Sequence, residues 1–218
     1  MFKKKINPLQ NYQDKIDSFI FENEKDIKNI NILEFGVREG RSTKMFLDIC
    51  AKNEGKLISV DVDDYSNLFN DNNWTFLKTR DDDYQKVSSY FSEDFDIILI
   101  DSLHEPNHVS KLIYTYWKHL KLNGSMYIDD ISWLPYVKNS WRDHEYTENI
   151  NRDTFNKILE IQLSNYDNIN LIFSFSGSGM CRIIKQNHNE LSKPKLMFPR
   201  KNYIKKILKR LFFLFKKT

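Results

Sequence analysis

An uninterrupted apolar run, Ile97-Ile98-Leu99-Ile100, lies near the middle of the chain and ends at Asp101. A strand with one face in water alternates apolar and polar residues, whereas a strand covered on both faces is apolar throughout. The run therefore predicts a strand of a parallel sheet that has helices on both sides. The rest of the chain has to supply those helices.

Strand and helix signals alternate along the sequence, as in a doubly wound fold. We expect strands at 31–35, 56–60, 74–78, 95–100, 125–128, 170–175 and 180–185. We expect helices at 8–29, 41–53, 83–92, 106–120 and 153–166. The turn Ser176-Gly177-Ser178-Gly179 predicts that the last two strands form a hairpin. The expected fold is α/β and Rossmann-like, with a doubly wound, mainly parallel seven-stranded sheet and an antiparallel edge hairpin.

Length and composition favour one domain with appendages. The 218 residues, 40% of them hydrophobic, can form a full core but are too few for two ordinary domains. We expect a helical lead-in at 1–30, the α/β domain at 31–192 and a tail at 193–218. Only Cys50 and Cys181 are present, which is too few for a disulfide framework and fits a reducing compartment.

The charge is unevenly divided between body and tail. Residues 193–218 contain ten Lys or Arg and no acid, which leaves 23 basic and 30 acidic residues, a net charge of −7, in 1–192. Nucleic-acid binding usually needs a basic stripe on the folded face, so we expect no nucleic-acid partner. No run of about 18 apolar residues occurs, and no apolar segment follows the basic start. We therefore predict neither a transmembrane helix nor a signal peptide, and a cytoplasmic location.

The tail has the pattern of a basic amphipathic helix over 201–218. Its apolar residues recur at spacings of three and four, at Ile204, Ile207, Leu208, Leu211, Phe212 and Phe215. Such a helix can lie on an anionic membrane, which would hold the protein at the inner face of the cytoplasmic membrane. The apolar stripe could instead pack on the body or on a second subunit, so a homo-oligomer stays open.

A glycine-containing turn follows the first predicted strand, at the edge of the sheet where doubly wound folds bind ligands. It reads Glu34-Phe35-Gly36-Val37-Arg38-Glu39-Gly40, and Arg41-Ser42-Thr43 then opens a helix. A dinucleotide fingerprint starting at Gly36 would need glycine at positions 38 and 41, which are both arginine. A pyrophosphate-binding turn is therefore not predicted.

The same turn resembles the E-x-G-x-x-x-G loop of class I S-adenosylmethionine-dependent methyltransferases. Asp61 supports the resemblance, because it ends the second strand where an acid can accept hydrogen bonds from ribose hydroxyls; an Asp there can also be a helix cap. The resemblance implies S-adenosylmethionine as cofactor, with Glu34 at its amino-acid end and the 79–82 stretch at its adenine. The implied cofactor-binding residues are Glu34, Gly36, Gly40, Ser42, Asp61, Asp81 and Asp82. Which residue of 79–82 touches the base stays open.

Three carboxylates, Asp101, Asp129 and Asp130, follow the fourth and fifth predicted strands. Neighbouring strand ends lie about 4.8 Å apart, so these carboxylates should converge in one crevice, and their oxygens suit a hard divalent cation. The chain resembles the cation-dependent O-methyltransferases, of the catechol type and of the sugar-modifying type in antibiotic pathways, which hold their metal at these positions. The resemblance implies Mg²⁺ or another divalent cation that lowers the pKa of the acceptor hydroxyl. A solvated loop or a helix cap is the alternative for Asp129-Asp130.

His104, three residues after Asp101, stands where that family carries a basic group or a histidine. A neutral imidazole suits proton removal near pH 7, so we predict His104 as general base, with Asp101 also catalytic; an exposed loop residue is the alternative. The aromatic and polar segment 132–146 suits the acceptor side of a site, or is a packed surface loop. A weaker resemblance to small bacterial methyltransferases encoded with surface-polysaccharide enzymes implies a hydroxyl of a sugar or glycan precursor as acceptor.

The sequence thus predicts a Mg²⁺-assisted, S-adenosylmethionine-dependent O-methyltransferase. Two alternatives stay open: a small-molecule or phenolic O-methyltransferase without membrane attachment, and a catalytically inactive, cofactor-binding scaffold subunit. The three retained carboxylates argue against the scaffold, because a degenerate site does not need all of them.

Overall fold

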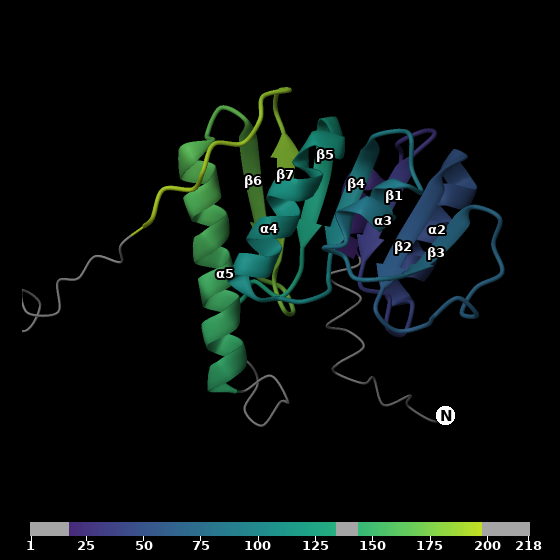
Figure 1. Ribbon diagram of the computed structural model, residues 1–218, viewed down its shortest axis with the longest axis horizontal. Helices are drawn as coiled ribbons and strands as arrows, with labels where there is room; N and C mark the ends of the chain where they lie inside the picture. Colours follow the sequence, from purple (N-terminus) through teal and green to yellow (C-terminus); the bar gives the residue numbers. More distant parts are fainter. Residues whose placement is uncertain (1–17, 134–143, 198–218) are drawn as a thin grey trace, which may run out of the picture.

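The computed structural model describes residues 18–133 and 144–197, which form one seven-stranded sheet with helices on both faces (Figure 1). The strands are β1 (Asn31–Phe35), β2 (Lys56–Asp61), β3 (Trp74–Lys78), β4 (Phe95–Ile100), β5 (Leu120–Ile128), β6 (Ile169–Ser174) and β7 (Met180–Lys185). The helices are α2 (Arg41–Asn53), α3 (Tyr84–Ser88), α4 (Pro106–Tyr116) and α5 (Glu145–Ser164), and residues 18–24 are also helical.

The strand order is β3-β2-β1-β4-β5-β7-β6. Strands β1 to β5 run parallel, whereas β7 is antiparallel to both of its neighbours, β5 and β6. The chain moves outward from β1 through β2 to β3 and then returns to β4 on the other side of β1, which creates the switch point where such sheets bind ligands. The predicted α/β fold, with its doubly wound sheet and antiparallel edge hairpin, is confirmed.

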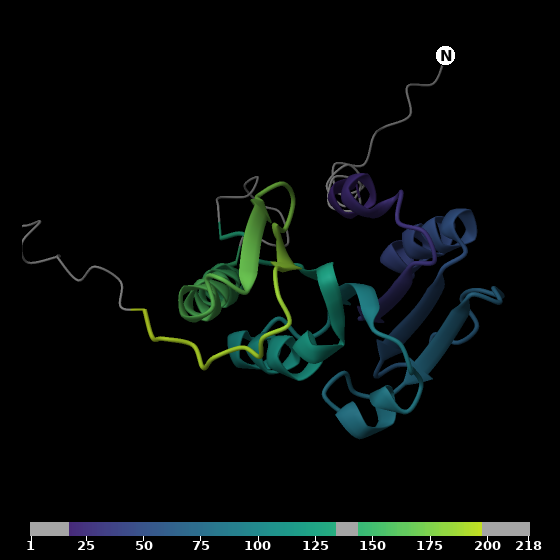
Figure 2. The same cartoon turned by 90° about the horizontal axis from the view of Figure 1, so that it is seen from above.

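The sheet is buried on both faces, which explains the apolar run in β4. Ile98 and Ile100 belong to the core under α3, α4 and α5, whereas Ile97 and Leu99 belong to the core under α2 and residues 18–24. Figure 2 shows these two helical layers on opposite sides of the sheet. Each residue of the run is at most 1% exposed, so neither face of β4 tolerates a polar side chain.

The helix at 18–24 is attached to the sheet by a buried polar network. The Glu24 carboxylate is 2% exposed, accepts a 2.5 Å hydrogen bond from the Tyr127 hydroxyl and lies 2.7 Å from Arg182 Nη2. A charge buried this deeply is tolerated only when it is paired and hydrogen-bonded. The network therefore fixes the lead-in segment against β5 and β7. Residues 8–17 of the predicted helix lie outside the described part, and within it the helix ends at residue 24 rather than 29.

Several predicted boundaries were wrong, for local physical reasons. Helix α4 ends at Tyr116 in a short 3₁₀ turn, and β5 begins at Leu120 because Asn123, at φ +62°, and Gly124 form a bulge inside the strand instead of a turn before it. Helix α3 ends at Ser88, four residues early. Helix α5 starts at Glu145, eight residues before the predicted start at 153. The prediction missed its first two turns because they are mostly polar, only partly buried, and show no apolar periodicity. The predicted tail helix lies outside the described residues, since these end at 197.

Candidate active site

The loop between β1 and α2 passes unusually close to the end of β4. Gly36 has φ +95°, and a Cβ atom at this position would lie 2.0 Å from the carbonyl oxygen of Asp101. Gly40 has φ +73° and begins α2, and a Cβ atom there would lie 2.8 Å from the Phe69 ring. Both positions therefore require glycine, which brings the loop backbone against the strand end that carries Asp101.

Glu34 lies behind this loop and is fully buried. Its carboxylate accepts hydrogen bonds from Ser42 Oγ at 2.5 Å, Thr43 Oγ1 at 2.8 Å and Ser59 Oγ at 2.6 Å. Burial raises the pKa of Glu34 to about 7, although the three hydroxyl donors oppose the shift. The structure thus places Glu34 and Ser42, two predicted cofactor residues, in a network that holds the start of α2 against β1 and β2.

A pocket of about 270 Å³ opens beyond the carboxyl ends of β1, β2 and β4, and we call it the cofactor pocket. It is lined by Gly36, Val60, Asp61, Val62, Thr79, Arg80, Asp81, Ser102, Leu103 and His108. Three predicted cofactor residues, Gly36, Asp61 and Asp81, are therefore brought together, whereas Glu34, Gly40, Ser42 and Asp82 do not line it. Asp61 is held in place because its carboxylate accepts backbone hydrogen bonds from Val37 at 2.8 Å and from Asp63 at 3.1 Å.

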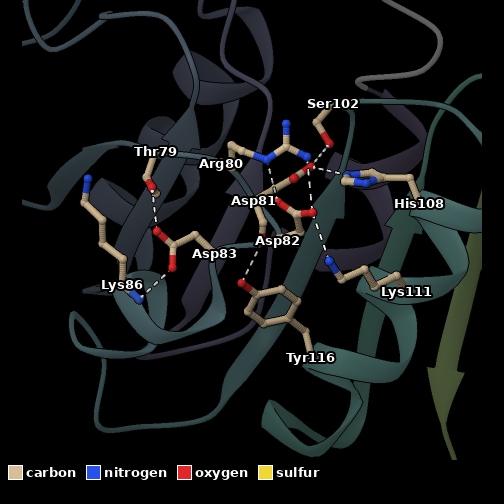
Figure 3. Close-up of polar contacts among 10 residues, drawn as sticks. All are labelled: Thr79, Arg80, Asp81, Asp82, Asp83, Lys86, Ser102, His108, Lys111 and Tyr116. Carbon is tan, nitrogen blue, oxygen red and sulfur yellow. Dashed lines mark hydrogen bonds and ion pairs between the residues drawn. The ribbon is translucent and has the colours of Figure 1, made fainter.

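The two neighbouring carboxylates Asp81 and Asp82 point to different partners (Figure 3). Asp81 Oδ2 accepts a hydrogen bond from Ser102 Oγ and lies 2.9 Å from His108 Nε2. Asp82 instead contacts Arg80 Nε at 2.8 Å and Lys111 Nζ at 2.9 Å, and these hydrogen bonds hold the pKa of Asp82 well below its usual range. Of these two carboxylates only Asp81 lines the cofactor pocket, together with Thr79 and Arg80, so Asp82 is the one residue of 79–82 that does not line it.

A second pocket of about 220 Å³ adjoins the first and shares Ser102 and Leu103 with it; we call it the acceptor pocket. Its lining is completed by His104, Glu105, Asp130, Tyr146, Thr147, Ile150 and Asn151. The first turns of α5 thus form one wall, opposite the ends of β4 and β5. Of the predicted acceptor segment 132–146, Tyr146 lines the pocket, Trp133 packs on Phe155 at 4.4 Å between ring centroids, and residues 134–143 lie outside the described part.

His104 lies between two of the predicted metal ligands. Its Nε2 atom is 3.6 Å from Asp101 Oδ1 and 3.4 Å from Asp130 Oδ2, which are ion-pair distances rather than hydrogen bonds. Its Nδ1 atom is buried and has no hydrogen-bond partner in the described part of the chain. Asp130 has φ +57°, a conformation that costs free energy in a residue other than glycine and that clusters at functional sites. The structure therefore brings together His104 and two of the three predicted metal ligands, Asp101 and Asp130.

Asp129 is buried beside this group and accepts a 2.8 Å hydrogen bond from Ser178 Oγ in the turn between β6 and β7. Burial, and then the charge of Asp130, raise the pKa of Asp129 to about 6. Within 18–133 and 144–197, no three or more His, Cys, Asp or Glu side chains are arranged to hold a metal ion. Asp101 and Asp130 fit Mg²⁺ as a pair, because this cation is commonly held by one or two carboxylates together with water and substrate oxygens. Asp129 fits less well as a third ligand, since Oδ1 is engaged by Ser178.

Two residues of the cofactor pocket, Ser102 and His108, were missed by sequence reasoning. Ser102 directly follows Asp101, and His108 lies in the first turn of α4, so both come just after the β4 strand end where ligands are expected. Their partner Asp81 is more than 20 residues away along the chain. The position after the strand was a usable signal, but the pairing depends on the tertiary fold.

Residues 33–131 match the protein-family model described as "Methyltransferase domain". No curated protein matches the chain. One similar solved structure is the MycE methyltransferase of the mycinamycin biosynthetic pathway, in complex with Mg, SAH and mycinamycin VI. It is 17% identical to this chain with a TM-score of 0.58, and the match covers 88% of this chain and 54% of MycE. The chain therefore spans about half the length of MycE.

Two shorter proteins are similar over most of their length. A putative caffeoyl-CoA O-methyltransferase from Staphylococcus aureus is 16% identical with a TM-score of 0.58, covering 84% of this chain and 85% of that one. The SAH-bound methyltransferase PaMTH1 from Podospora anserina is 13% identical with a TM-score of 0.60, covering 79% and 78%. The family match runs from β1 through the glycine loop to the residue after Asp130. Residues 33–131 therefore match a methyltransferase domain, and the fold is similar to that of these solved methyltransferases.

Proposed function

We propose that this chain transfers the methyl group of S-adenosylmethionine to a hydroxyl oxygen of a sugar or glycan precursor, with assistance from Mg²⁺. The observation that carries the proposal is the junction of the two pockets. They share Ser102 and Leu103, and Asp101, His104 and Asp130 gather beside this boundary. Methyl transfer needs the donor, the acceptor oxygen and a base in one line of approach, and this junction offers that arrangement.

The cofactor pocket suits S-adenosylmethionine in three places. Gly36 lines the pocket without a side chain and would permit close approach at the amino-acid end. The Asp61 carboxylate would accept from the ribose hydroxyls, and Asp81 would face the base. Glu34, Gly40 and Ser42 support the cofactor through the loop, because they fix the start of α2. Asp82 supports the cofactor pocket indirectly, through its ion pairs with Arg80 and Lys111.

His104 is the general base of this proposal. It lines the acceptor pocket and takes the proton of the acceptor hydroxyl while the oxygen attacks the sulfonium methyl group. The O–CH₃ bond forms as the S–CH₃ bond breaks, and S-adenosylhomocysteine leaves. The carboxylates of Asp101 and Asp130, 3.6 and 3.4 Å from Nε2, stabilise the imidazolium ion that results.

Mg²⁺, when bound, would supply Lewis-acid polarisation of the acceptor hydroxyl. Asp101 and Asp130 would hold it, with Asp129 behind them. Support comes from the geometry, because Asp101 Oδ1 and Asp130 Oδ2 both lie within 3.6 Å of the same atom, His104 Nε2. MycE, which has a similar fold, was solved with Mg and SAH.

The acceptor pocket favours a ring that carries hydroxyl groups. Tyr146 is 64% exposed and offers an aromatic face, while Thr147 and Glu105 offer hydrogen-bonding groups. MycE, which has a similar fold, was solved in complex with mycinamycin VI. Leu103 and Ile150 also line the pocket, and this apolar surface favours the second candidate, a phenolic small molecule.

The basic tail would bring the enzyme to membrane-associated glycan precursors. The last described residue, Met197, lies against α5, because its backbone N–H donates to Glu160 Oε1 at 3.0 Å. The amphipathic segment 201–218 lies outside the described residues. None of the helices described between 18 and 197 has the length and apolarity to cross a bilayer. Flotation with anionic vesicles tests the idea: the full chain should float and the 1–198 truncation should not. Equal flotation contradicts it, and a dimer lost on truncation would assign the tail to a second subunit.

The test of the activity is methyl transfer to a panel of sugars, nucleotide-linked sugars and catechols, followed by mass spectrometry of the product. We expect a methylated sugar, and His104→Ala should reduce turnover by about 10²- to 10⁴-fold with S-adenosylhomocysteine affinity retained. Lys44→Gln, on the exposed face of α2, serves as the control and should leave turnover unchanged. Full turnover in His104→Ala contradicts the assigned base, and methylation of catechols alone selects the second candidate.

A further inference from the structure

Helix α5 is hydrogen-bonded to both of the loops that carry the candidate catalytic residues. Thr154 Oγ1 donates a 2.8 Å hydrogen bond to the backbone carbonyl oxygen of His104, in the loop after β4. Asn151 Nδ2 donates a 2.9 Å hydrogen bond to the backbone carbonyl oxygen of Ser132, two residues after Asp130. The two donors are three residues apart and therefore lie on the same face of α5. One helix face is thus tied to the loops that follow β4 and β5.

Both donors are buried, which makes the two hydrogen bonds difficult to replace. Thr154 is 0% exposed and Asn151 is 1% exposed. Water has little access to either side chain, so a carbonyl group that lost its donor here would not be compensated by solvent. The two hydrogen bonds therefore oppose any displacement of the loops away from α5.

The segment after Asp130 is held from a second side by the turn between β6 and β7. The Ser132 backbone N–H donates to the Ser178 carbonyl oxygen at 2.8 Å, and a Cβ atom at Gly179 would lie 2.5 Å from Ser132 Cβ. Asp130 itself has φ +57°, a conformation that persists only when its surroundings hold it. Asn151 therefore completes a clamp that keeps the Asp130 backbone in this conformation.

The His104 ring depends on its backbone for its position. Nδ1 has no hydrogen-bond partner in the described ranges 18–133 and 144–197. Nε2 lies 3.6 Å from Asp101 Oδ1 and 3.4 Å from Asp130 Oδ2, which are ion-pair distances. Because these contacts leave the ring free to tilt, the hydrogen bond from Thr154 to the His104 carbonyl group is the directional contact that fixes this residue.

We propose that Thr154 and Asn151 are positioning residues for methyl transfer. Thr154 holds His104 at the acceptor pocket, and Asn151 holds Asp130 beside it. The proposal rests on the proposed function, because it assumes that His104 and Asp130 act on the acceptor. An in-line transfer depends steeply on the placement of the reacting groups, so the loss of either hydrogen bond slows the chemical step. Neither residue lines the cofactor pocket, so cofactor binding should not change.

The kinetic experiment uses variants that keep the shape of each side chain. Thr154→Val removes only the hydroxyl donor, Thr154→Ser keeps it, and Asn151→Asp replaces the amide donor with a carboxylate that cannot donate. With a sugar that the wild type methylates, kcat should fall roughly 10- to 100-fold in Thr154→Val and Asn151→Asp and stay near wild type in Thr154→Ser. The dissociation constant of S-adenosylhomocysteine should not change. Asn156→Ala, on the exposed side of α5, serves as the control.

A second experiment needs neither cofactor nor acceptor. The ring signals of His104 are followed by NMR in protein with isotopically labelled histidine and are assigned with His104→Ala. In Thr154→Val they should broaden and move toward the signals of the exposed His188, because the loop is released. In Thr154→Ser they should stay at the wild-type positions.

The outcomes separate this inference from the function beneath it. Unchanged kcat in Thr154→Val and Asn151→Asp overturns the positioning roles, and so does an equal loss of kcat and of S-adenosylhomocysteine affinity, which indicates a merely structural contribution. A wild type that methylates no compound of the panel contradicts the proposed function, and the ring signals then still show whether Thr154 positions His104. If a variant does not fold, Thr154→Cys, with a weaker donor, and Asn151→Ala take the places of Thr154→Val and Asn151→Asp.

Discussion

The buried carboxylate of Glu34 makes the stability of this protein depend on pH in a direction opposite to that of a salt-bridged acid. Burial raises its pKa from 4.5 to about 7 in the folded chain. The folded state therefore retains the Glu34 proton to a higher pH than the unfolded state does. The stability that this group contributes is complete below about pH 4.5 and is lost as the pH rises to about 7.

The size of the loss follows from the shift. A difference of about 2.5 units, at 1.36 kcal/mol for each, amounts to about 3 kcal/mol of unfolding free energy. Glu34→Gln cannot ionise and so lacks this component at every pH. Its side-chain carbonyl can still accept from Ser59 or Thr43, while the amide donates to a hydroxyl that reorients.

Urea unfolding of wild type and Glu34→Gln at intervals from pH 4.5 to 8 measures the effect. The difference between the two unfolding free energies should change by about 3 kcal/mol in favour of the Gln variant as the pH rises to 7, and then level off. Glu22→Gln, on the exposed face of the 18–24 helix, controls for the loss of a surface carboxylate. Parallel pH curves for wild type and Glu34→Gln would refute the reasoning.

Three further changes probe the site. Gly36→Ala should lower S-adenosylhomocysteine affinity at least roughly tenfold in titration, since its Cβ would lie 2.0 Å from the Asp101 carbonyl, and it should cost about 1–3 kcal/mol in thermal unfolding. Gly177→Ala, also at a positive φ (+65°) but in the turn between β6 and β7, should keep the affinity. Asp61→Asn should weaken S-adenosylhomocysteine binding by roughly 10- to 100-fold, because the variant loses a charged acceptor that also accepts from the Val37 N–H. An unchanged dissociation constant would contradict the assignment of Asp61 to the ribose. Removal of divalent cations with a chelator should reduce turnover yet leave cofactor affinity unchanged, because Asp130 lines the acceptor pocket and neither Asp101 nor Asp130 lines the cofactor pocket. Full turnover in chelator excludes the Mg²⁺ proposal.

Much of the fold was predictable because its signals are local. The apolar run in β4 indicated a strand buried on both faces, and the glycine turn indicated the ligand-binding edge of the sheet. Local signals failed where the chain departs from periodicity. Asn123-Gly124 has the composition of a turn but forms a bulge in β5, and the start of α5 is mostly polar because it is only partly buried.

The candidate site was predictable by position but not by orientation. The strand-end rule brought Asp61, Asp101, His104 and Asp130 to one edge, as the structure has them. The direction of a side chain depends on partners distant in sequence. Glu34 turns away from the pocket because Ser59 of β2 completes its hydrogen bonds, and Asp81 rather than Asp82 faces the pocket.

The central claim is that the pocket at the switch point, lined by Gly36, Asp61 and Asp81, binds the S-adenosyl cofactor. Isothermal titration of the purified chain with S-adenosylhomocysteine tests it most directly, with Asp61→Asn as the paired variant. We expect saturable binding of one molecule per chain that is clearly weaker in Asp61→Asn. A folded wild-type chain that gives no binding heat, or that binds as tightly as Asp61→Asn, would contradict the account.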